Sequence, residues 1–394
     1  MADAGLPRLL YIADVQVESS QHGSALMYRA FEKYPSDRLR IIETAVASQP
    51  ARRLTGVAYA AMPIARQRWL NSRFHGIYSA WLSSRAPGRA DEVIASLHGF
   101  DVEAILTVGH GFGWLTAAEA ARRLNVPLHI IVHDDWPRAS AIAESLRGWL
   151  DRAFGRVYRG AASRLCVSPF MAEEYERRYG AAGAVMYPSR SHDCPVFAAK
   201  PARAIADDDM VIGYGGNSGA QMVECLRVLA LALQGTRARL VVFGGFSEEA
   251  QRLLREASAA IEFRGFVPYQ EMIRGLRDSA DVLFVPMSFA DDQRDNMAIS
   301  FPSKLTDYTA TGLPLLIHGP AYASAVRWAR AENDLAEIVD DPGYASLRAA
   351  IERLQRESGR RTQLAVRAVA AGHRYFDAAH ARMALQTAIA GSAA

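Results

Sequence analysis

The chain has 394 residues, of which 50% are hydrophobic and 22% charged, and a formal net charge of +3. This is the composition of a soluble globular protein and the length of two domains. No stretch approaches the roughly 20 apolar residues of a membrane span, and the apolar run 9–13 is too short for a secretory signal. Cys166, Cys194 and Cys225 are too widely spaced for a disulfide framework or a zinc site. We therefore expect a cytoplasmic protein with reduced thiols.

In chain order, short apolar runs alternate with segments of helical periodicity. In the first half we expect strands at about 9–13, 39–43, 104–108, 128–132, 164–167 and 184–187. The pattern then starts again, with strands expected at 211–213, 240–243, 261–263, 282–285, 315–317 and 337–339. From about Tyr344 onward the composition is helical, with a break expected near Gly372. This alternation predicts an α/β fold with parallel sheets and right-handed crossovers.

The restart of the pattern divides the chain into two Rossmann-like, doubly wound domains. A stretch with two prolines and three consecutive aspartates, 195–209, has the composition of a linker. We expect an N-terminal domain at 1–200 and a C-terminal domain at 201–375. Residues 376–394 are expected to form a helix that can cross back to the N-terminal domain.

One segment of the N-terminal domain, 52–90, holds seven arginines and neither Asp nor Glu. Aromatic and leucine side chains lie between these arginines: Tyr59, Trp69, Leu70, Phe74, Tyr78, Trp81 and Leu82. Two interpretations stay open, a surface that lies on an anionic membrane and a helical excursion that packs its aromatics into the core. No helix-turn-helix, zinc-finger or RNP motif supports a nucleic-acid partner.

Glycine, histidine and short polar residues follow several expected strands, at 107–111, 132–135, 213–219 and 243–245. Ligands of parallel sheets bind beyond the carboxyl ends of the strands. Glycine lets backbone amides approach a ligand closely, and the N-terminus of the following helix favours an anion. Four such strand ends, spread over two domains, predict ligand sites in both.

The segment 301–316, Phe-Pro-Ser-Lys-Leu-Thr-Asp-Tyr-Thr-Ala-Thr-Gly-Leu-Pro-Leu-Leu, resembles the donor-site helix of GT-B glycosyltransferases, especially the retaining family 4 type. The resemblance implies that Asp307 binds the nucleotide ribose, since a carboxylate can accept two hydrogen bonds from ribose hydroxyls. Lys304, one turn earlier, would reach a phosphate, with Ser303 beside it in the donor site.

Other segments carry the same resemblance. The sequences of 104–110 and 125–134 are similar to a family run whose later histidine, here His133, lies near the reacting sugar. The loop 19–24 stands where the family has a glycine-rich acceptor loop. The resemblance thus implies a role for His133 in catalysis, together with Lys304, and an acceptor side formed by His22, Gly23, His110 and Asp134.

In the second domain, 261–268 resembles the segment that holds the nucleotide base, which assigns Arg264, Phe266 and Val267 to the donor site. Residues 279–286 match the strand that precedes the donor-site helix.

The sequence departs from the family at three places, of which the first is the acceptor loop, where only Gly23 is a glycine. The loop after the first strand of the second domain lacks the usual Arg and Lys, so the diphosphate is assigned to Lys304, Arg294 and the backbone amides of Gly215, Gly216, Asn217 and Ser218. The first of two acids that stand eight positions apart is also missing, because Ile299 lies eight before Asp307. From the preceding loop, the candidates to replace it are Asp291, Asp292 and Asp295.

The resemblance implies a GT-B fold, with two Rossmann-like domains facing each other across a cleft. It implies transfer of a sugar from a nucleoside-diphosphate sugar, a UDP- or GDP-sugar, to a hydroxyl acceptor, with retention and without a bound metal or cofactor. The acceptor would be a glycan or a lipid-linked molecule, as in assembly of a surface glycan. The segment 52–90 would then bring the enzyme to the inner face of the plasma membrane.

Three alternatives stay open. A nicotinamide oxidoreductase is suggested by Gly213 and Gly215, but the third glycine of its GxGxxG motif stands at 219 instead of 218, and no acid follows the next strand. A sugar-nucleotide epimerase shares the GT-B architecture. A non-catalytic GT-B protein that binds a glycan or a partner would explain the missing basic residues and the missing first acid.

Overall fold

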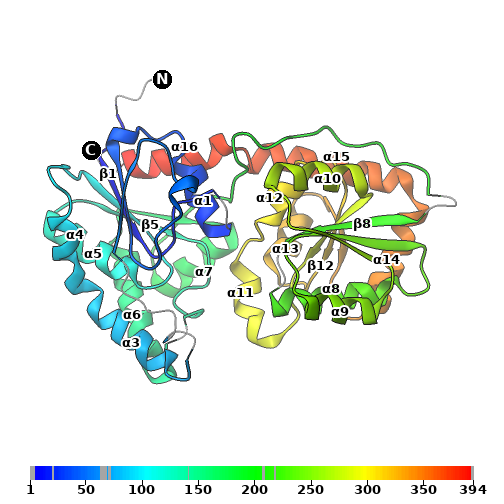
Figure 1. Cartoon of the computed structure of the whole chain (residues 1–394), viewed down its shortest axis with the longest axis horizontal. Helices are drawn as coiled ribbons and strands as arrows, with labels where there is room; N and C mark the ends of the chain where they lie inside the picture. The colour runs from blue at the N-terminus through cyan, green and yellow to red at the C-terminus, as the bar shows by residue number, and fades with distance from the viewer. Residues whose placement is uncertain are drawn as a thin grey trace. The chain divides into compact units, whose positions relative to one another are not determined.

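The computed structural model describes residues 5–19, 22–62, 69, 72–140, 142–205, 209–216 and 219–391, without the side chain of His22. The described residues fold into two compact units, each a parallel sheet covered by helices (Figure 1). Unit 1 comprises the described residues of Met1–Ser189 and Ala378–Ala394, and unit 2 comprises those of Arg190–Asp377. The predicted α/β fold with two doubly wound domains is confirmed. In the described part of the chain, no helix combines the length and the apolar character that a membrane crossing requires.

The sheet of unit 1 has seven strands in the order β3-β2-β1-β4-β5-β6-β7. Their bounds are Leu9–Ala13 (β1), Leu39–Glu43 (β2), Ala58–Ala61 (β3), Ala104–Val108 (β4), Leu128–Val132 (β5), Ser163–Cys166 (β6) and Ala184–Val185 (β7). The helices are His22–Phe31 (α1), His75–Arg85 (α3), Ala90–Ala95 (α4), Gly113–Leu124 (α5), Glu144–Gly160 (α6), Pro169–Tyr179 (α7) and Ala378–Ala390 (α16), with short 3-10 turns at Ser36–Arg38, Pro50–Arg52 and Pro87–Arg89.

Strand β1 shows how the sequence builds two cores, because successive side chains of a strand point to opposite faces. Leu9 and Tyr11 pack on one face with α1 and α16. Leu10 and Ile12 pack on the other face with α4 and α5. All of these side chains are fully buried. A strand that is apolar throughout is therefore the expected centre of a sheet covered on both faces.

The sheet of unit 2 has six strands in the order β10-β9-β8-β11-β12-β13. Their bounds are Met210–Gly215 (β8), Ala238–Phe243 (β9), Ile261–Gly265 (β10), Val282–Pro286 (β11), Leu315–His318 (β12) and Glu337–Val339 (β13). The helices are Ala220–Leu233 (α8), Glu248–Ala257 (α9), Tyr269–Ser279 (α10), Arg294–Ile299 (α11), Lys304–Tyr308 (α12), Ser324–Ala331 (α13), Tyr344–Arg356 (α14) and Ser358–Tyr375 (α15), with a 3-10 turn at Asp291–Gln293.

Unit 2 begins at Arg190, before the expected boundary at 201. The backbone of the intervening segment explains this, since Phe197 N donates to Ala310 O at 2.8 Å and Lys200 N donates to Gly312 O at 2.7 Å. The chain returns to unit 1 at Ala378, and Ala381, Leu385 and Ile389 of α16 join the core around α1.

The break predicted near Gly372 lies a few residues later, because α15 continues through this residue to Tyr375 and α16 begins at Ala378. The glycine serves close packing instead. A Cβ at this position would overlap Nη2 of the buried Arg190.

Candidate functional site

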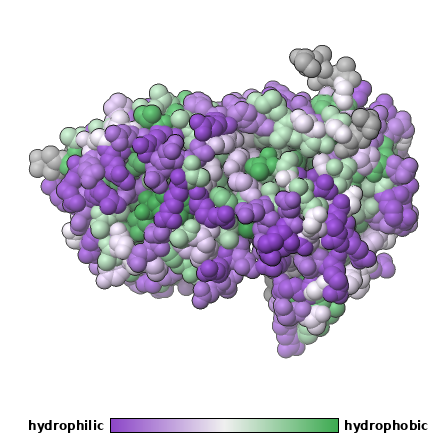
Figure 2. Space-filling model, turned by 180° about the vertical axis from the view of Figure 1, so that it is seen from behind, coloured by the Kyte–Doolittle hydropathy of each residue, from purple (hydrophilic) through white to green (hydrophobic). Residues whose placement is uncertain are grey.

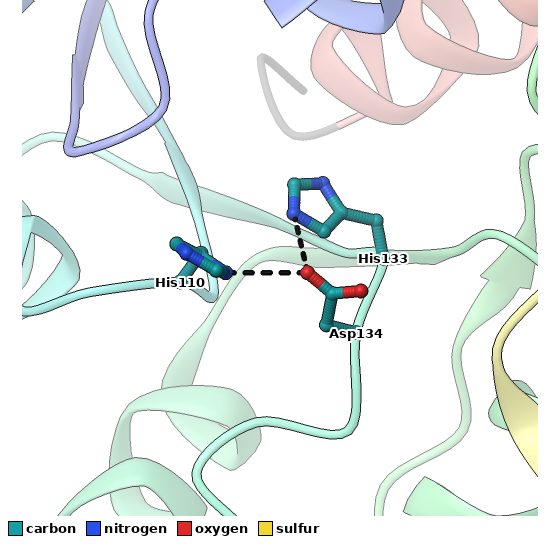
Figure 3. Close-up of side chains that lie close together, drawn as sticks. All are labelled: His110, His133 and Asp134. Carbon is teal, nitrogen blue, oxygen red and sulfur yellow. Dashed lines mark ion pairs between the residues drawn. The ribbon is translucent and has the colours of Figure 1, made fainter. Parts of the chain in front are cut away.

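In unit 1, two neighbouring strands deliver the predicted acceptor-side residues to one place. Strands β4 and β5 are parallel partners, with Val108 opposite Ile131, so the residues that follow them emerge at the same edge of the sheet. His110 Nδ1 and His133 Nε2 each lie 3.2 Å from the same oxygen, Oδ2 of Asp134 (Figure 3). The centroids of the two imidazole rings are 5.6 Å apart. We call His110, His133 and Asp134 the His–Asp–His cluster.

Gly23, in the first turn of α1, lies directly against this cluster. A Cβ at Gly23 would come 3.2 Å from Cε1 of His133 and 3.7 Å from Cγ1 of Val15. A larger side chain would therefore occupy the space beside the imidazole. The side chain of His22, also predicted for the acceptor side, lies outside the described part of the structure.

The cluster carries a fixed negative charge between two imidazoles. Burial raises the pKa of the Asp134 carboxyl, but its hydrogen bonds with His110 and His133 outweigh this effect and hold the pKa below its usual range. Burial lowers the pKa of His110, but the hydrogen bond with Asp134 and its charge outweigh burial and raise it. Asp134 is thus an anion at neutral pH, and it favours the protonated form of His110.

The same three residues also offer a set of metal ligands. One ligand atom from each of His110, His133 and Asp134 lies within 4.8 Å of the other two, and two imidazoles with a carboxylate suit zinc or a similar ion. The sequence did not indicate this set, because His133 and Asp134 stand 23 and 24 positions after His110. Only the pairing of their strands brings them together. A histidine ligand usually donates its second ring N–H to a neighbour. His133 Nδ1 is buried without a hydrogen-bond partner among the described residues, so no such neighbour is found for this ring.

Sequence reasoning missed Asp14, which shapes the loop that carries His110. Asp14 follows β1 and accepts hydrogen bonds from Phe112 N, at 2.6 Å, and from Thr44 Oγ1. Gly111 has a φ of +61°, and a Cβ there would overlap the Asp14 carboxylate. The sequence feature that could have indicated Asp14 is its position, since it is an acid directly after the first buried strand.

In unit 2, two glycine turns at the ends of β8 and β9 lie in contact. Gly216 N donates to Phe243 O at 2.9 Å, and Gly244 has a φ of +140°. A Cβ at Gly244 would overlap Gly216 O, so only glycine fits there. The Tyr308 hydroxyl fixes the turn further, since it accepts from Gly215 N at 2.8 Å and donates to Gly215 O at 3.2 Å.

Lys304 directs its ammonium at this turn. A Cβ at Gly216 would come 2.5 Å from Lys304 Nζ, and the ammonium lies 5.1 Å from the centroid of the Tyr214 ring. No ion pair with Lys304 is found among the described residues. Burial lowers its pKa to about 8, against the opposing effect of the Asp307 charge. A cation that is poorly compensated and lies beside backbone turns is suited to an anionic ligand.

Asp307 lies three residues beyond Lys304, on the same short helix α12. Its Oδ1 accepts a hydrogen bond from the Tyr269 hydroxyl at 2.7 Å, and Thr306 Oγ1 lies 3.1 Å from the same oxygen. Arg190, which sequence reasoning missed, holds the helix, because Nε donates to Thr306 O at 2.9 Å and Nη2 to Thr309 Oγ1 at 2.8 Å. We call Gly215, Gly216, Lys304 and Asp307 the turn–lysine site.

The remaining predicted donor residues have other surroundings. Arg264 pairs with Glu262 at 2.6 Å, and the guanidinium of Arg294 lies 4.2 Å from the centroid of the Tyr322 ring. Phe266 follows β10 and is 84% exposed. Val267 is partly buried, and Ser303 precedes α12 with its carbonyl accepting from Thr306 Oγ1 at 2.6 Å. Asn217 and Ser218 lie outside the described residues, and the acid candidates Asp291, Asp292 and Asp295 are exposed.

The chain resembles known glycosyltransferases. Residues 31–188, which include the His–Asp–His cluster, match the family model of Glycosyltransferase Family 4. No curated protein matches the sequence at a significant level. Similar solved structures include Anabaena HepE in complex with UDP, at a TM-score of 0.72 and 12% identity, covering 97% of this chain and 99% of that chain.

Two further structures are similar over nearly their whole length. The alpha,alpha-trehalose 6-phosphate synthase from Burkholderia multivorans has a TM-score of 0.66 and 14% identity, with 98% of this chain and 97% of that chain covered. The lipopolysaccharide outer core galactosyltransferase WaaB, in its apo form, has a TM-score of 0.62 and 14% identity, with 97% and 98% covered. At such identities the likeness shows the fold, which is GT-B. Together with the family match, this identifies the chain as a GT-B glycosyltransferase that resembles family 4.

Proposed function

We propose that the protein transfers a sugar from a nucleoside-diphosphate sugar to a hydroxyl acceptor, with retention of anomeric configuration and without a bound metal or cofactor. One observation carries this proposal: the Lys304 ammonium lies beside the Gly216 turn, with no ion pair among the described residues. The chemistry needs such a group, because the barrier lies in the departure of the diphosphate. A preorganised cation stabilises the charge that develops on it.

The turn–lysine site supplies the donor contacts. Lys304 binds the diphosphate, and Asp307 accepts hydrogen bonds from the ribose hydroxyls. The hydrogen bond from Tyr269 keeps the Asp307 carboxylate in place for this contact. The amides of Gly215 and Gly216, which the sequence assigned to the diphosphate, already donate to the Tyr308 hydroxyl and to Phe243 O, so they hold the turn that faces Lys304. Exposed Phe266 and the backbone near Val267 lie at the end of β10, where the resemblance puts the base.

The His–Asp–His cluster binds and orients the transferred sugar. His133 contacts the sugar, and Asp134 holds its imidazole in position. During transfer the bond from the anomeric carbon to the diphosphate breaks, the acceptor oxygen bonds to that carbon, and the acceptor proton passes to the departing diphosphate. This sequence of bond changes needs no metal.

The similar structures support a uridine nucleotide. HepE is described in complexes with UDP and with UDP-glucose, at 12% and 13% identity to this chain. A UDP-sugar is therefore our first choice of donor, followed by a GDP-sugar.

For the acceptor, we propose a glycan or a lipid-linked hydroxyl, as in polysaccharide biosynthesis. WaaB is described as a lipopolysaccharide outer core galactosyltransferase. The basic aromatic segment 52–90 would hold a cytoplasmic enzyme peripherally at the inner face of the plasma membrane.

The donor assignment is tested by a thermal-shift screen of UDP-, GDP-, ADP- and dTDP-sugars, with NAD(P) as a negative set. A ligand that binds only the native state raises the melting temperature. We expect a shift with one nucleotide series that is lost in Asp307→Asn and kept in Asp278→Asn, an exposed acid of the same unit. No shift from a folded sample would favour the non-catalytic alternative, and a shift with NAD(P) alone would reject the donor site.

The epimerase alternative needs a separate readout. Incubation with the donor that binds, followed by analysis of the sugar, should show transfer to acceptor or slow hydrolysis. A nucleotide-sugar epimer as the product would contradict the proposed transfer.

A further inference from the structure

The basic aromatic segment of unit 1 divides into two parts in the structure. Its first part belongs to the fold, since β3 pairs with β2 and the Tyr59 hydroxyl donates to Val17 O at 3.0 Å. The guanidinium of Arg53 lies 4.7 Å from the centroid of the Tyr59 ring. The candidate interaction surface therefore lies in the second part, among the described residues of 69–85.

Four neighbouring rings lie along this second part, the exposed Trp69, Phe74 and Trp81 and the half-buried Tyr78, and we call them the ladder. The centroid distances are 6.5 Å for Trp69–Phe74, 6.2 Å for Trp69–Tyr78 and 5.6 Å for the stacked pair Tyr78–Trp81. Trp69, Phe74 and Trp81 are 41%, 45% and 48% exposed, and Ile77 is 70% exposed. Apolar groups gathered at this exposure, on α3 and just before it, indicate an interaction surface.

The opposite side of α3 is anchored in the unit. Ser79, Leu82 and Ser83 are buried. Gly76 contacts the start of α6, because Ala143 N donates to Gly76 O at 3.3 Å and a Cβ at Gly76 would come 3.1 Å from that nitrogen. The two helices lie together at the lower end of unit 1 (Figure 1). The ladder is thus displayed by a fixed helix.

The charge around the ladder is positive. The guanidinium of Arg73 lies 4.8 Å from the centroid of the Phe74 ring, and Arg85 is exposed in the last turn of α3. In the adjoining segment 138–160 there are five arginines and two acids, and this part of α6 also exposes Leu146 and Trp149. On the face seen in Figure 2, hydrophilic side chains cover much of the lower end of this unit, with hydrophobic ones among them.

We propose that α3 and the start of α6 form a docking surface for an anionic phospholipid bilayer. Tryptophan and tyrosine prefer the membrane–water boundary, because the apolar ring can contact lipid while its N–H or O–H group contacts water. Arginine pairs with lipid phosphates. A second copy of the chain would bring like charges together, whereas an anionic surface is complementary to them. The proposal rests on the proposed function in one respect: membrane binding would give the enzyme access to a lipid-linked acceptor.

The test is co-sedimentation of the full chain with vesicles, without nucleotide or acceptor. Vesicles of phosphatidylglycerol with phosphatidylcholine should bind the chain at least tenfold more strongly than phosphatidylcholine alone, and added salt should weaken this binding. Ile77→Ser with Trp81→Ser, and separately Arg73→Gln with Arg85→Gln, should each lower the binding about tenfold. The matched control is Val366→Ser with Arg252→Gln, an exposed apolar residue and an exposed arginine of unit 2, which should bind as wild type.

Three results would overturn the docking surface: equal binding to both kinds of vesicle, ladder variants that bind like wild type, or self-association that the same variants abolish. Melting temperatures show that each variant is folded. Transfer to a soluble acceptor should be the same in wild type and ladder variants. If vesicle binding is lost and transfer is intact, the donor-site assignment stands. If transfer fails and vesicle binding is intact, only the proposed function is rejected.

Discussion

The Lys304 ammonium and Gly216 are spatial neighbours, so close that a Cβ on the glycine would lie 2.5 Å from Nζ. Gly216→Ala should displace the lysine from the turn and raise the KM for the donor roughly tenfold, equivalent to about 1.4 kcal/mol. Steady-state kinetics with varied donor measures this change. Gly219→Ala is the matched control, because nothing lies within 4 Å of a Cβ there. Equal effects of the two substitutions would contradict the role of the Lys304–Gly216 contact.

The pKa of Lys304, about 8, predicts a pH dependence of donor binding. The ammonium is charged below this pH, so affinity for a diphosphate should fall as the pH rises through the region above 8. The pKa in the folded chain lies below that of the unfolded chain, so deprotonation of Lys304 should add stability between about pH 8 and the ordinary lysine range. Donor KM measured from pH 6.5 upward tests the first effect.

Lys304→Arg provides the control for this profile, because a guanidinium stays charged throughout the range. The variant should lose the alkaline fall in affinity even if its overall affinity differs. If donor affinity falls equally above pH 8 in wild type and in Lys304→Arg, a group other than Lys304 causes the fall.

Much of the fold follows from the sequence because buried strands are apolar on both faces. The runs that became β1, β2, β4 and β5 were predicted with their observed bounds. Strand β3 was missed, since its Ala-Tyr-Ala-Ala sequence is short and only partly buried, so its pattern is weak. It forms through pairing with β2, a long-range contact that a local pattern does not contain.

The candidate sites were predictable where they lie at strand ends, and not where they depend on side-chain geometry. His110 and His133 were expected individually, but their common partner oxygen on Asp134 follows from strand register. Arg190 lies more than a hundred residues before α12, and nothing in its local sequence indicates that it holds that helix.

His133→Ala tests the assignment of the His–Asp–His cluster to the transferred sugar. Loss of one preorganised group at the reacting centre lowers kcat on the order of 10²-fold. The thermal shift with the free nucleotide should be unchanged, because the turn–lysine site belongs to unit 2. His373→Ala, an exposed histidine of α15, serves as control. A variant that keeps kcat but loses nucleotide binding would reverse the assignment.

Metal removal distinguishes a hydrogen-bonded cluster from a metal centre at His110, His133 and Asp134. Because the carboxylate already pairs with both imidazoles, transfer should be unchanged after treatment with a chelator and dialysis. Metal analysis of the purified protein accompanies the assay. Activity that is lost with the chelator and restored by zinc would show that these ligand atoms hold an ion.

Gly372 and Arg190 give a prediction on stability. The Arg190 guanidinium fills the space where a side chain at Gly372 would begin, and a Cβ there would also lie 2.6 Å from Thr309 Oγ1. Gly372→Ala should therefore destabilise the fold by about 1–3 kcal/mol, the usual effect of overpacking, although alanine is the better helix former. Urea unfolding measures the difference. Gly359→Ala, on the same helix with nothing within 4 Å of a Cβ, should leave stability unchanged or raise it by up to about 1 kcal/mol. If both substitutions stabilise the protein, the Arg190 side chain can be accommodated without a glycine at 372. Its hydrogen bonds to α12 would then persist after a shift of α15.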